Sequence, residues 1–214
     1  LFIIGTTSLV GAFRNYRKGL VSIRTALLFG IPSIATVFIA RQFLLPAIPP
    51  VLFKVDGFEV TKSFATMTLF ASLMLFASIS MIRPGNTSLQ TSPPKSRTRF
   101  LANLLLAGIG VGLVTGLLGA GGGFLLIPVL VLLFKMPMKE AVGTSLLIIA
   151  LNSLFGFVGD VGIVSPDWTF LLILTAIAIA GILLGGWLSN RIDGKRLKTG
   201  FGWFVFIMAV YILI

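Results

Sequence analysis

An apolar run from 100 to 134 contains, at 108–128, the sequence GIGVGLVTGLLGAGGGFLLIP. Its first glycines, at 108, 112 and 116, recur at every fourth residue. They therefore share one face of a helix, where small residues let a second helix approach closely. The next cluster, 119–123, cannot continue a helix comfortably, because each glycine costs a helix about 1 kcal/mol relative to alanine. We expect a break at 119–123 and a second helix that begins at about residue 124.

The start of that second helix has a chemical consequence. Its first backbone N–H groups lack partners within the helix, and the helix dipole adds positive charge there, so this end favours an anion. The alternative is a tight bend that only packs helices closely. No dinucleotide fingerprint or phosphate-binding P-loop fits these glycines. The candidate substrate-binding residues of this segment are Gly119, Gly121, Gly122 and Gly123.

The composition of the chain is that of a membrane protein. Of its 214 residues, 57% are hydrophobic and 11% are charged, whereas soluble domains carry about 25% charged residues. A soluble domain of this size could not bury so much apolar surface, which excludes a soluble enzyme. The chain also has no histidine and no cysteine. We therefore expect no disulfide, no metal site and no cofactor.

Further apolar runs have the length of membrane helices. They lie at about 25–45, 63–82, 141–158, 168–190 and 199–214, and a shorter run occupies 1–13. Unsatisfied backbone groups are costly in lipid, so these runs must be helices. Because the sequence opens inside an apolar run, we expect its natural N-terminus to be missing. By symmetry with 100–134, the missing part is expected to contain a second broken helix.

The charged residues predict the orientation in the membrane. The net charge is +11, and the basic borders of the apolar runs are 14–24, 83–99, 135–140 and 191–198. The neutral or acidic borders are 46–62 and 159–167. The two kinds alternate if 100–134 enters the membrane and returns to the same side, and basic borders face the cytoplasm. We expect a multi-pass protein of the cell (inner) membrane whose partner is the lipid bilayer, and no nucleic acid.

A short repeat relates the two halves of the chain. Thr7-Ser8-Leu9 recurs as Thr144-Ser145-Leu146, and Asn15 recurs as Asn152, at the same offset of 137 residues. With the orientation above, the two copies cross the membrane in opposite directions. Inverted repeats are typical of transporters, because two such halves can expose one central site to either side in turn.

The predicted fold is an all-α polytopic integral membrane protein with two inverted repeats and a Gly-rich broken, re-entrant helix pair. Its first transmembrane repeat occupies 1–82, a cytoplasmic linker occupies 83–99, and the second transmembrane repeat occupies 100–214.

The repeated polar residues form a second group of site candidates. Ser145 and Asn152 share a helix face at a spacing of seven residues, and Ser8 and Asn15 repeat that pattern. Hydroxyl and amide groups can donate to an oxyanion without adding charge. The alternative is ordinary hydrogen bonding between helices. The candidate substrate-binding residues of this group are Thr7, Ser8, Asn15, Thr144, Ser145 and Asn152.

One known family shares these motifs. The stretch from Gly112 to Asn152 contains G-x-x-x-G-x-x-G-x-G-G-G, then Pro128, then Gly143-Thr144-Ser145-Leu146, and it resembles the TauE/SafE sulfite exporter family. The similarity covers nearly the whole chain. The first-half Gly-rich block of that family is absent here, in keeping with a missing N-terminal segment. The resemblance implies permeation of small sulfur-containing anions such as sulfite or sulfoacetate.

The sequence thus predicts a membrane transporter of a small anionic substrate, a sulfur oxyanion in particular, that works by alternating access. The acidic residues Glu140, Asp160 and Asp167 lie only at helix borders, which disfavours a cation transporter. The alternative is a non-transporting membrane scaffold. An intramembrane enzyme is disfavoured, because no His, Cys or paired carboxylate is available to activate a nucleophile. The number of subunits stays open, a homo-oligomer included.

Overall fold

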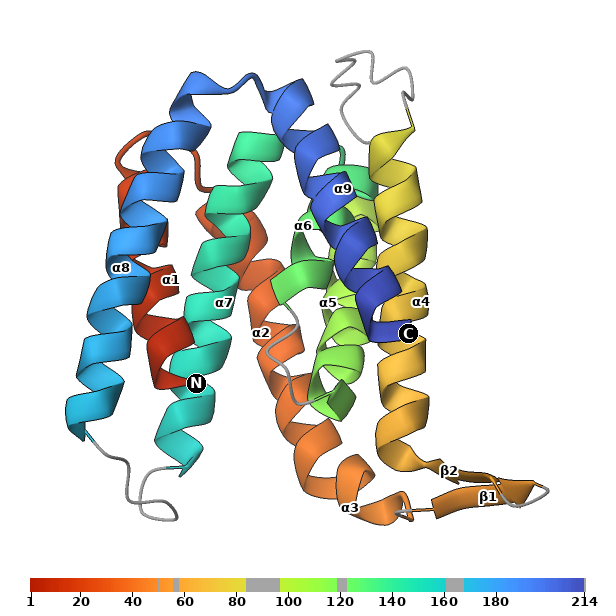
Figure 1. Cartoon of the computed structure of the whole chain (residues 1–214). Coiled ribbons are helices and arrows are strands. Elements are labelled where there is room, and N and C mark those ends of the chain that lie inside the picture. The colour runs from red at the N-terminus through yellow and green to blue at the C-terminus, as the bar shows by residue number, and fades with distance from the viewer. Residues whose placement is uncertain (50, 56–57, 84–96, 119–122, 161–167, 214) are drawn as a thin grey trace.

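Helices make up most of the computed structural model, which describes all residues except 50, 56–57, 84–96, 119–122, 161–167 and 214. They stand side by side as a bundle (Figure 1), which confirms the predicted all-α fold. The longer helices are α1 (Phe2–Tyr16), α2 (Ile23–Ile39), α4 (Lys62–Ile82), α5 (Arg97–Leu118), α6 (Gly123–Leu132), α7 (Met138–Asp160), α8 (Trp168–Arg191) and α9 (Gly194–Leu213). A π-helical segment, η1 (Ala40–Leu44), and the short helix α3 (Leu45–Ala47) extend α2.

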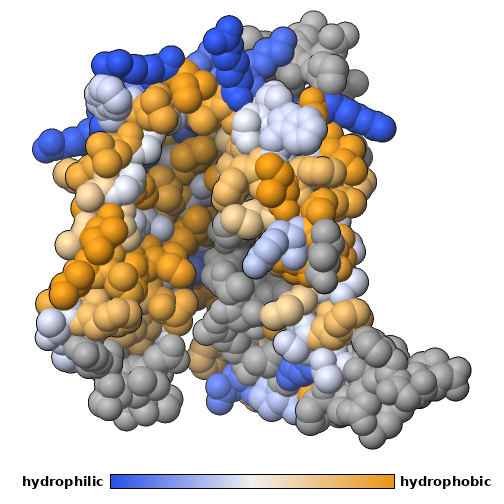
Figure 2. Space-filling model, in the orientation of Figure 1, coloured by the Kyte–Doolittle hydropathy of each residue, from blue (hydrophilic) through white to orange (hydrophobic). Residues whose placement is uncertain are grey.

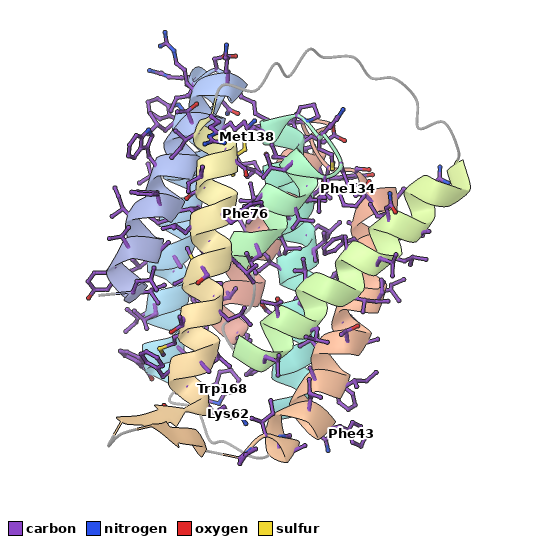
Figure 3. All side chains as sticks on the ribbon, turned by 90° about the vertical axis from the view of Figure 1, so that its right-hand side faces the viewer. Phe43, Lys62, Phe76, Phe134, Met138 and Trp168 are labelled. Atoms are coloured by element: carbon purple, nitrogen blue, oxygen red, sulfur yellow. The ribbon has the colours of Figure 1, made fainter. Side chains whose placement is uncertain are left out.

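Five of the described helical segments are long and apolar enough to cross a membrane. These spans are Ile23–Leu44, Lys62–Ile82, Met138–Phe157, Trp168–Arg191 and Gly194–Leu213. Figure 2 shows hydrophobic side chains over the middle of the bundle and hydrophilic side chains gathered at one end. On α4, Phe76 is 74% exposed (Figure 3). An apolar surface of this extent is typical of a bundle solvated by lipid.

The two ends of the bundle differ in charge. The turns 17–22, 133–137 and 192–193 lie at one end, which we call the basic end (Figure 1). The other end carries α3 and the β-strands, and we call it the hairpin end. Figure 3 shows Met138 at the basic end, and Lys62 at the hairpin end. The predicted basic borders 14–24, 135–140 and 191–198 therefore share one end, and most of 83–99 and 159–167 lies outside the described residues.

Helices α5 and α6 form the predicted re-entrant pair. Helix α5 begins at the basic end, and α6 returns to it (Figure 1). Helix α6 has 10 residues. At 1.5 Å per residue it spans roughly 15 Å, about half of a hydrocarbon core. Helix α6 is therefore too short to cross the membrane by itself, as expected for a segment that returns to the side on which α5 begins.

The two copies of the Thr-Ser-Leu repeat lie in helices that run in opposite directions. Helices α1 and α7 pack against each other and are antiparallel (Figure 1). Gly5 of α1 faces Leu154 of α7, and Gly11 faces Leu146. Helices α4 and α9 form a second antiparallel pair. This arrangement agrees with the predicted inverted repeats.

The regularly spaced glycines of α5 lie against α2. A Cβ atom built on Gly108 would stand 2.6 Å from the carbonyl oxygen of Phe29. One built on Gly112 would stand 2.6 Å from the carbonyl oxygen of Ser33. Only glycine allows the two backbones to come this close, so the predicted packing seam is confirmed.

We expect Gly112→Ala to lower the melting temperature of the purified protein. The added methyl group would overpack the seam, which typically costs about 1–3 kcal/mol. The matched control is Gly110→Ala, two residues away in α5, where a Cβ atom has nothing within 4 Å. This control should be neutral or slightly stabilising, because alanine favours a helix by about 1 kcal/mol over glycine. Equal melting temperatures for the two variants would contradict the seam.

The segment 46–62, expected as a plain loop, contains a β-hairpin. Strand β1 (Val51–Val55) pairs antiparallel with β2 (Phe58–Thr61), and Lys54 lies opposite Glu59. Valine and phenylalanine recur in both strands, and such residues favour extended backbone. The hairpin lies at the end of the helix bundle and leaves its all-α architecture unchanged.

The segment 191–198, expected as a turn, is mostly helical. Helix α8 ends at Arg191, and α9 begins at Gly194. The basic residues Lys195, Arg196 and Lys198 therefore belong to the first turns of α9. A short connection at the top of the basic end links α8 to α9 (Figure 1).

Candidate functional site

A cavity of about 310 Å³ lies at the basic end among α1, α6, α7, α8 and α9. Figure 2 shows the surface hollowed between the α8 side and the α9 side. None of the described residues that line the cavity is acidic. Its floor includes Gly11 and Leu146, where the two inverted copies cross. Its polar lining consists of Arg14, Asn15, Lys18, Lys139, Ser189 and Asn190.

The end of α1 places its cations at the cavity. Gly19 has φ of 69°, a conformation that favours glycine and commonly ends a helix. The N–H of Leu20 donates to the carbonyl of Asn15 at 3.0 Å, and the N–H of Gly19 donates to that of Tyr16 at 2.9 Å. This pair of bonds is the Schellman motif. It fixes Lys18 at the end of α1, next to the cavity.

The turn that follows α1 is docked on the start of α7. The carbonyl oxygen of Leu20 lies where a side chain at Gly143 would begin. One residue on, the hydroxyl of Thr144 accepts a hydrogen bond from the N–H of Ser22 at 3.0 Å. Gly143 and Thr144 therefore hold the turn 17–22 against α7. Lys18 and Leu20 of this turn form one wall of the cavity.

Three cations line the cavity without an acidic neighbour among the lining residues. Arg14 donates from Nη1 to the carbonyl oxygen of Leu183 at 2.6 Å, and Lys18 donates from Nζ to Oδ1 of Asn190 at 2.9 Å. Lys18 is exposed, and slight desolvation, followed by the positive charges of Arg14 and Lys139, lowers its pKa. The cavity is thus a positively charged site in which an anion would relieve repulsion.

Two other cations of the basic end interact with aromatic rings. Arg17 lies over the ring of Phe13, with Cζ at 4.9 Å from the centroid, and Arg191 lies over Trp187 at 4.0 Å. Neither arginine lines the cavity. Only some of the cations at the basic end therefore line the cavity, whereas Arg17 and Arg191 stack on aromatic rings instead.

The candidate residues of the basic end are engaged mainly within the protein. Asn15 lines the cavity and donates from Nδ2 to the carbonyl of Gly11 at 2.8 Å. The hydroxyl of Thr144 holds the N–H of Ser22, as described above. The hydroxyl of Ser145 donates to the carbonyl of Val142 at 2.9 Å. Of these three residues, Asn15 is the one with access to a ligand in the cavity.

The candidates Thr7, Ser8 and Asn152 lie away from the cavity lining. Ser8 is buried. Asn152 donates from Nδ2 to Oγ of Ser33 at 3.4 Å. The hydroxyl of Thr7 and Oδ1 of Asn152 are buried without a hydrogen-bond partner among the described residues. Rotating the Asn152 amide by half a turn would place its oxygen on Ser33 and free its NH₂ to donate.

The two repeated asparagines lie at different depths. Asn15 is four residues from Gly11 toward the basic end, and Asn152 is six residues from Leu146 toward the hairpin end. At 1.5 Å per residue they are roughly 15 Å apart along the bundle. Four-atom oxyanions are too small to touch both at once in this conformation. The candidates Gly119, Gly121 and Gly122 lie outside the described residues, and Gly123 begins α6.

Sequence reasoning missed the cavity cations as ligands, because Arg14, Lys18 and Lys139 were counted only as orientation signals. A usable signal was present. Gly11, Arg14, Asn15 and Lys18 follow one another at spacings of three, one and three residues, which puts them on one helix face. Such a polar and basic face at the end of an apolar helix is a signal of a functional site.

Comparison with known proteins identifies the family. The sequence matches the family described as "Sulfite exporter TauE/SafE" over residues 1–212. It is 34% identical to a probable membrane transporter protein of Methanocaldococcus jannaschii, over 50% of this chain and 43% of that protein. It is 38% identical to one of Bacillus subtilis, over 41% of this chain and 32% of that protein.

A longer match supports the same family. A probable membrane transporter protein of Xylella fastidiosa is 26% identical over 98% of this chain and 78% of its own length. The matches to the first two relatives cover less than half of those proteins. No solved structure matches this chain. Its sequence, together with a bundle of membrane-length helices, shows that the chain belongs to the TauE/SafE sulfite exporter family of membrane transporters.

Proposed function

We propose that this protein moves small oxyanions across the cell membrane by alternating access, with sulfur oxyanions such as sulfite or sulfoacetate as its substrates. The observation that carries the proposal is the basic cavity, which runs from the basic end to the crossing of α1 and α7. A non-transporting scaffold would need the glycine seams but no such cavity.

The charge of the cavity favours an anion. Arg14, Lys18 and Lys139 line it, and none of the described lining residues is acidic. A concave site of one sign raises the local concentration of the opposite ion. Neutral donors such as Asn15 and Ser189 add hydrogen bonds without more charge. Catalysis is not part of the proposal, because the chain contains no His or Cys and the described lining residues include no carboxylate base.

The depth of the cavity suits a pathway by which an anion reaches the centre of the bundle. Ile127 of α6 lines it and lies four residues beyond Gly123, roughly 6 Å along the helix. An anion in the cavity would therefore be about one helical turn from the start of α6. The glycines at 119–123 remain our proposed backbone ligands there, because a helix start favours negative charge.

The inverted repeat supports alternating access. In the basic-end half, Asn15 of one copy lies next to Gly143 of the other. Toward the hairpin end, the equivalent residues Thr7 and Asn152 lie on the same two helices. We infer two related half-sites, one reached from each side of the membrane. A rocking motion of the two repeats would open them in turn.

Flux measurements on the full-length protein test the proposal. Proteoliposomes loaded with radiolabelled sulfite or sulfoacetate should release it faster than protein-free vesicles, and excess unlabelled anion outside should accelerate exchange. Absence of flux for both anions, from protein that is folded by its melting curve, would reject this function and favour the scaffold.

Labelling of single cysteines tests the orientation. The chain has no cysteine, and we propose that its basic end faces the cytoplasm. Lys195→Cys, at an exposed position of the basic end, should resist a membrane-impermeant thiol reagent in intact cells. Ser63→Cys, exposed near the hairpin end, should react. Both should react after the cells are opened, and the reverse pattern in intact cells would invert the proposed topology.

A further inference from the structure

Two cations of the cavity also connect α1 to α8. Arg14 donates to the backbone carbonyl of Leu183 at 2.6 Å, and Lys18 donates to the side-chain oxygen of Asn190 at 2.9 Å. Both partners lie in the second half of α8, toward the basic end. The cations therefore hold α8 against α1 along one edge of the cavity.

Neither acceptor carries a charge. A carbonyl and an amide oxygen satisfy the donors, yet they leave the positive charges of Arg14 and Lys18 uncompensated. A negatively charged acceptor adds Coulomb attraction to the hydrogen bond, which a neutral carbonyl or amide oxygen does not offer. An oxyanion would therefore be a better partner for either cation than the one it has on α8.

The surface of α8 is shaped for this contact. A Cβ atom built on Gly186 would stand 3.3 Å from Nη1 of Arg14, whereas one built on the neighbouring Gly185 has nothing within 4 Å. The absence of a side chain at Gly186 lets the guanidinium lie close to the helix backbone. The planar guanidinium could equally present two N–H groups to an oxyanion, which suits bidentate binding.

We propose that Arg14 and Lys18 form an anion-operated latch: without substrate they fasten α8 to α1, and a small oxyanion in the cavity takes over both cations and frees α8. The latch rests on the proposed function, since it assigns the substrate's first ligands and couples their occupation to a movement of α8. The lowered pKa of Lys18, which follows from slight desolvation and the positive charges of Arg14 and Lys139, fits a cation that lacks an anionic partner.

Sulfite binding to the purified full-length protein, measured by calorimetry, tests the ligand assignment. Lys18→Gln removes one cationic ligand and should weaken binding about tenfold or more. Asn190→Leu removes only the competing acceptor, so the same cation is free for the anion. This variant should bind sulfite about two- to fivefold more tightly, the factor expected for one exposed contact.

Arg17→Gln is the matched control. It removes one positive charge from the same end of α1, but Arg17 stacks on Phe13 and does not line the cavity. Its sulfite affinity should stay within about twofold of the parent, because exposed charges are screened at physiological salt. Equal losses in Arg17→Gln and Lys18→Gln would overturn the latch in favour of a diffuse basic surface. Weaker binding in Asn190→Leu would overturn it as well.

A distance measurement tests the movement. Spin labels on Tyr16→Cys and Leu188→Cys, both at exposed positions of α1 and α8, report the separation of the two helices at the basic end. Saturating sulfite should shift their distance distribution to longer values in the parent and leave it unchanged in Lys18→Gln. A distribution that does not respond to bound sulfite would overturn the latch.

These outcomes are separable from failure of the transport proposal. Binding and helix movement without flux would support the latch and reject transport. Normal sulfite flux with unaltered affinity in Lys18→Gln would support transport and reject the latch.

Discussion

Gly143→Val is expected to reduce the melting temperature by about 4–16 °C, at roughly 2–4 °C per kcal/mol for a chain of this size. The first atom of the new side chain would occupy the place of the Leu20 carbonyl oxygen, and the Cβ atom of Asn15 would be 3.1 Å away. Overpacking of this kind costs about 1–3 kcal/mol, and loss of the bond from Ser22 to Thr144 adds about 1 kcal/mol. Sulfite binding should be lost too, because the displaced turn forms a wall of the cavity.

The control for this prediction is Gly181→Val in α8. It also adds a β-branched residue inside a helix, but its Cβ atom has nothing within 4 Å. Thr144→Val then removes only the hydrogen bond to Ser22 and should cost about 1 kcal/mol. Thermal unfolding and sulfite binding are measured on all three purified variants. A Gly143→Val protein as stable as Gly181→Val would contradict the docking of the turn.

The helices of this fold could be predicted from the sequence for physical reasons. Lipid offers no partner for backbone groups, so each apolar run of sufficient length must be a helix. The glycines at 119–123 predicted a break, and the matching ends of α5 and α6 follow from it. The basic borders then predicted which helix ends lie on the same side of the membrane, without any information on how the helices pack. The hairpin at 51–61 escaped prediction because the membrane rule does not apply beyond the bundle.

The cavity contacts could not be predicted in the same way. Arg14 and Leu183 are 169 residues apart in the chain, and Lys18 and Asn190 are 172 apart. Such contacts depend on how α1 and α8 pack against each other, and this packing cannot be derived from the composition of the chain. The basic residues at the end of α1 could be seen in the sequence. They predict a cytoplasmic helix end whether or not they also bind a ligand, so they did not point to a site.

The repeated asparagines show a further limit of sequence reasoning. The matching offset suggested that Asn15 and Asn152 face one ion. An inverted repeat, however, maps each residue to the opposite depth of the membrane, so only residues near the crossing of α1 and α7 meet their counterparts. Gly11 and Leu146 lie there, whereas the asparagines lie on opposite sides of it. In our proposed mechanism, one small anion would therefore meet the two asparagines in succession rather than together.

Asn152→Asp is expected to abolish sulfite transport and to destabilise the protein. Its carboxylate would replace an amide whose Oδ1 is already buried without a partner among the described residues. A charge of this kind within a membrane helix costs about 2.5–3.5 kcal/mol, and it would repel an approaching anion. Asn152→Leu, in contrast, removes the unpaired oxygen and the 3.4 Å contact with Ser33, so its melting temperature should change little.

The leucine variant separates a ligand from a helix contact. If the Asn152 amide donates to a desolvated anion, Asn152→Leu should weaken sulfite binding about 10–150-fold, since a hydrogen bond to a charged group contributes about 1.5–3 kcal/mol. Ser33→Ala is the matched control, because it breaks the same contact between α7 and α2 and leaves the amide in place. Equal affinities in both variants would make the repeated asparagine a packing residue, and the anion would then cross the hairpin-end half of the bundle on other donors.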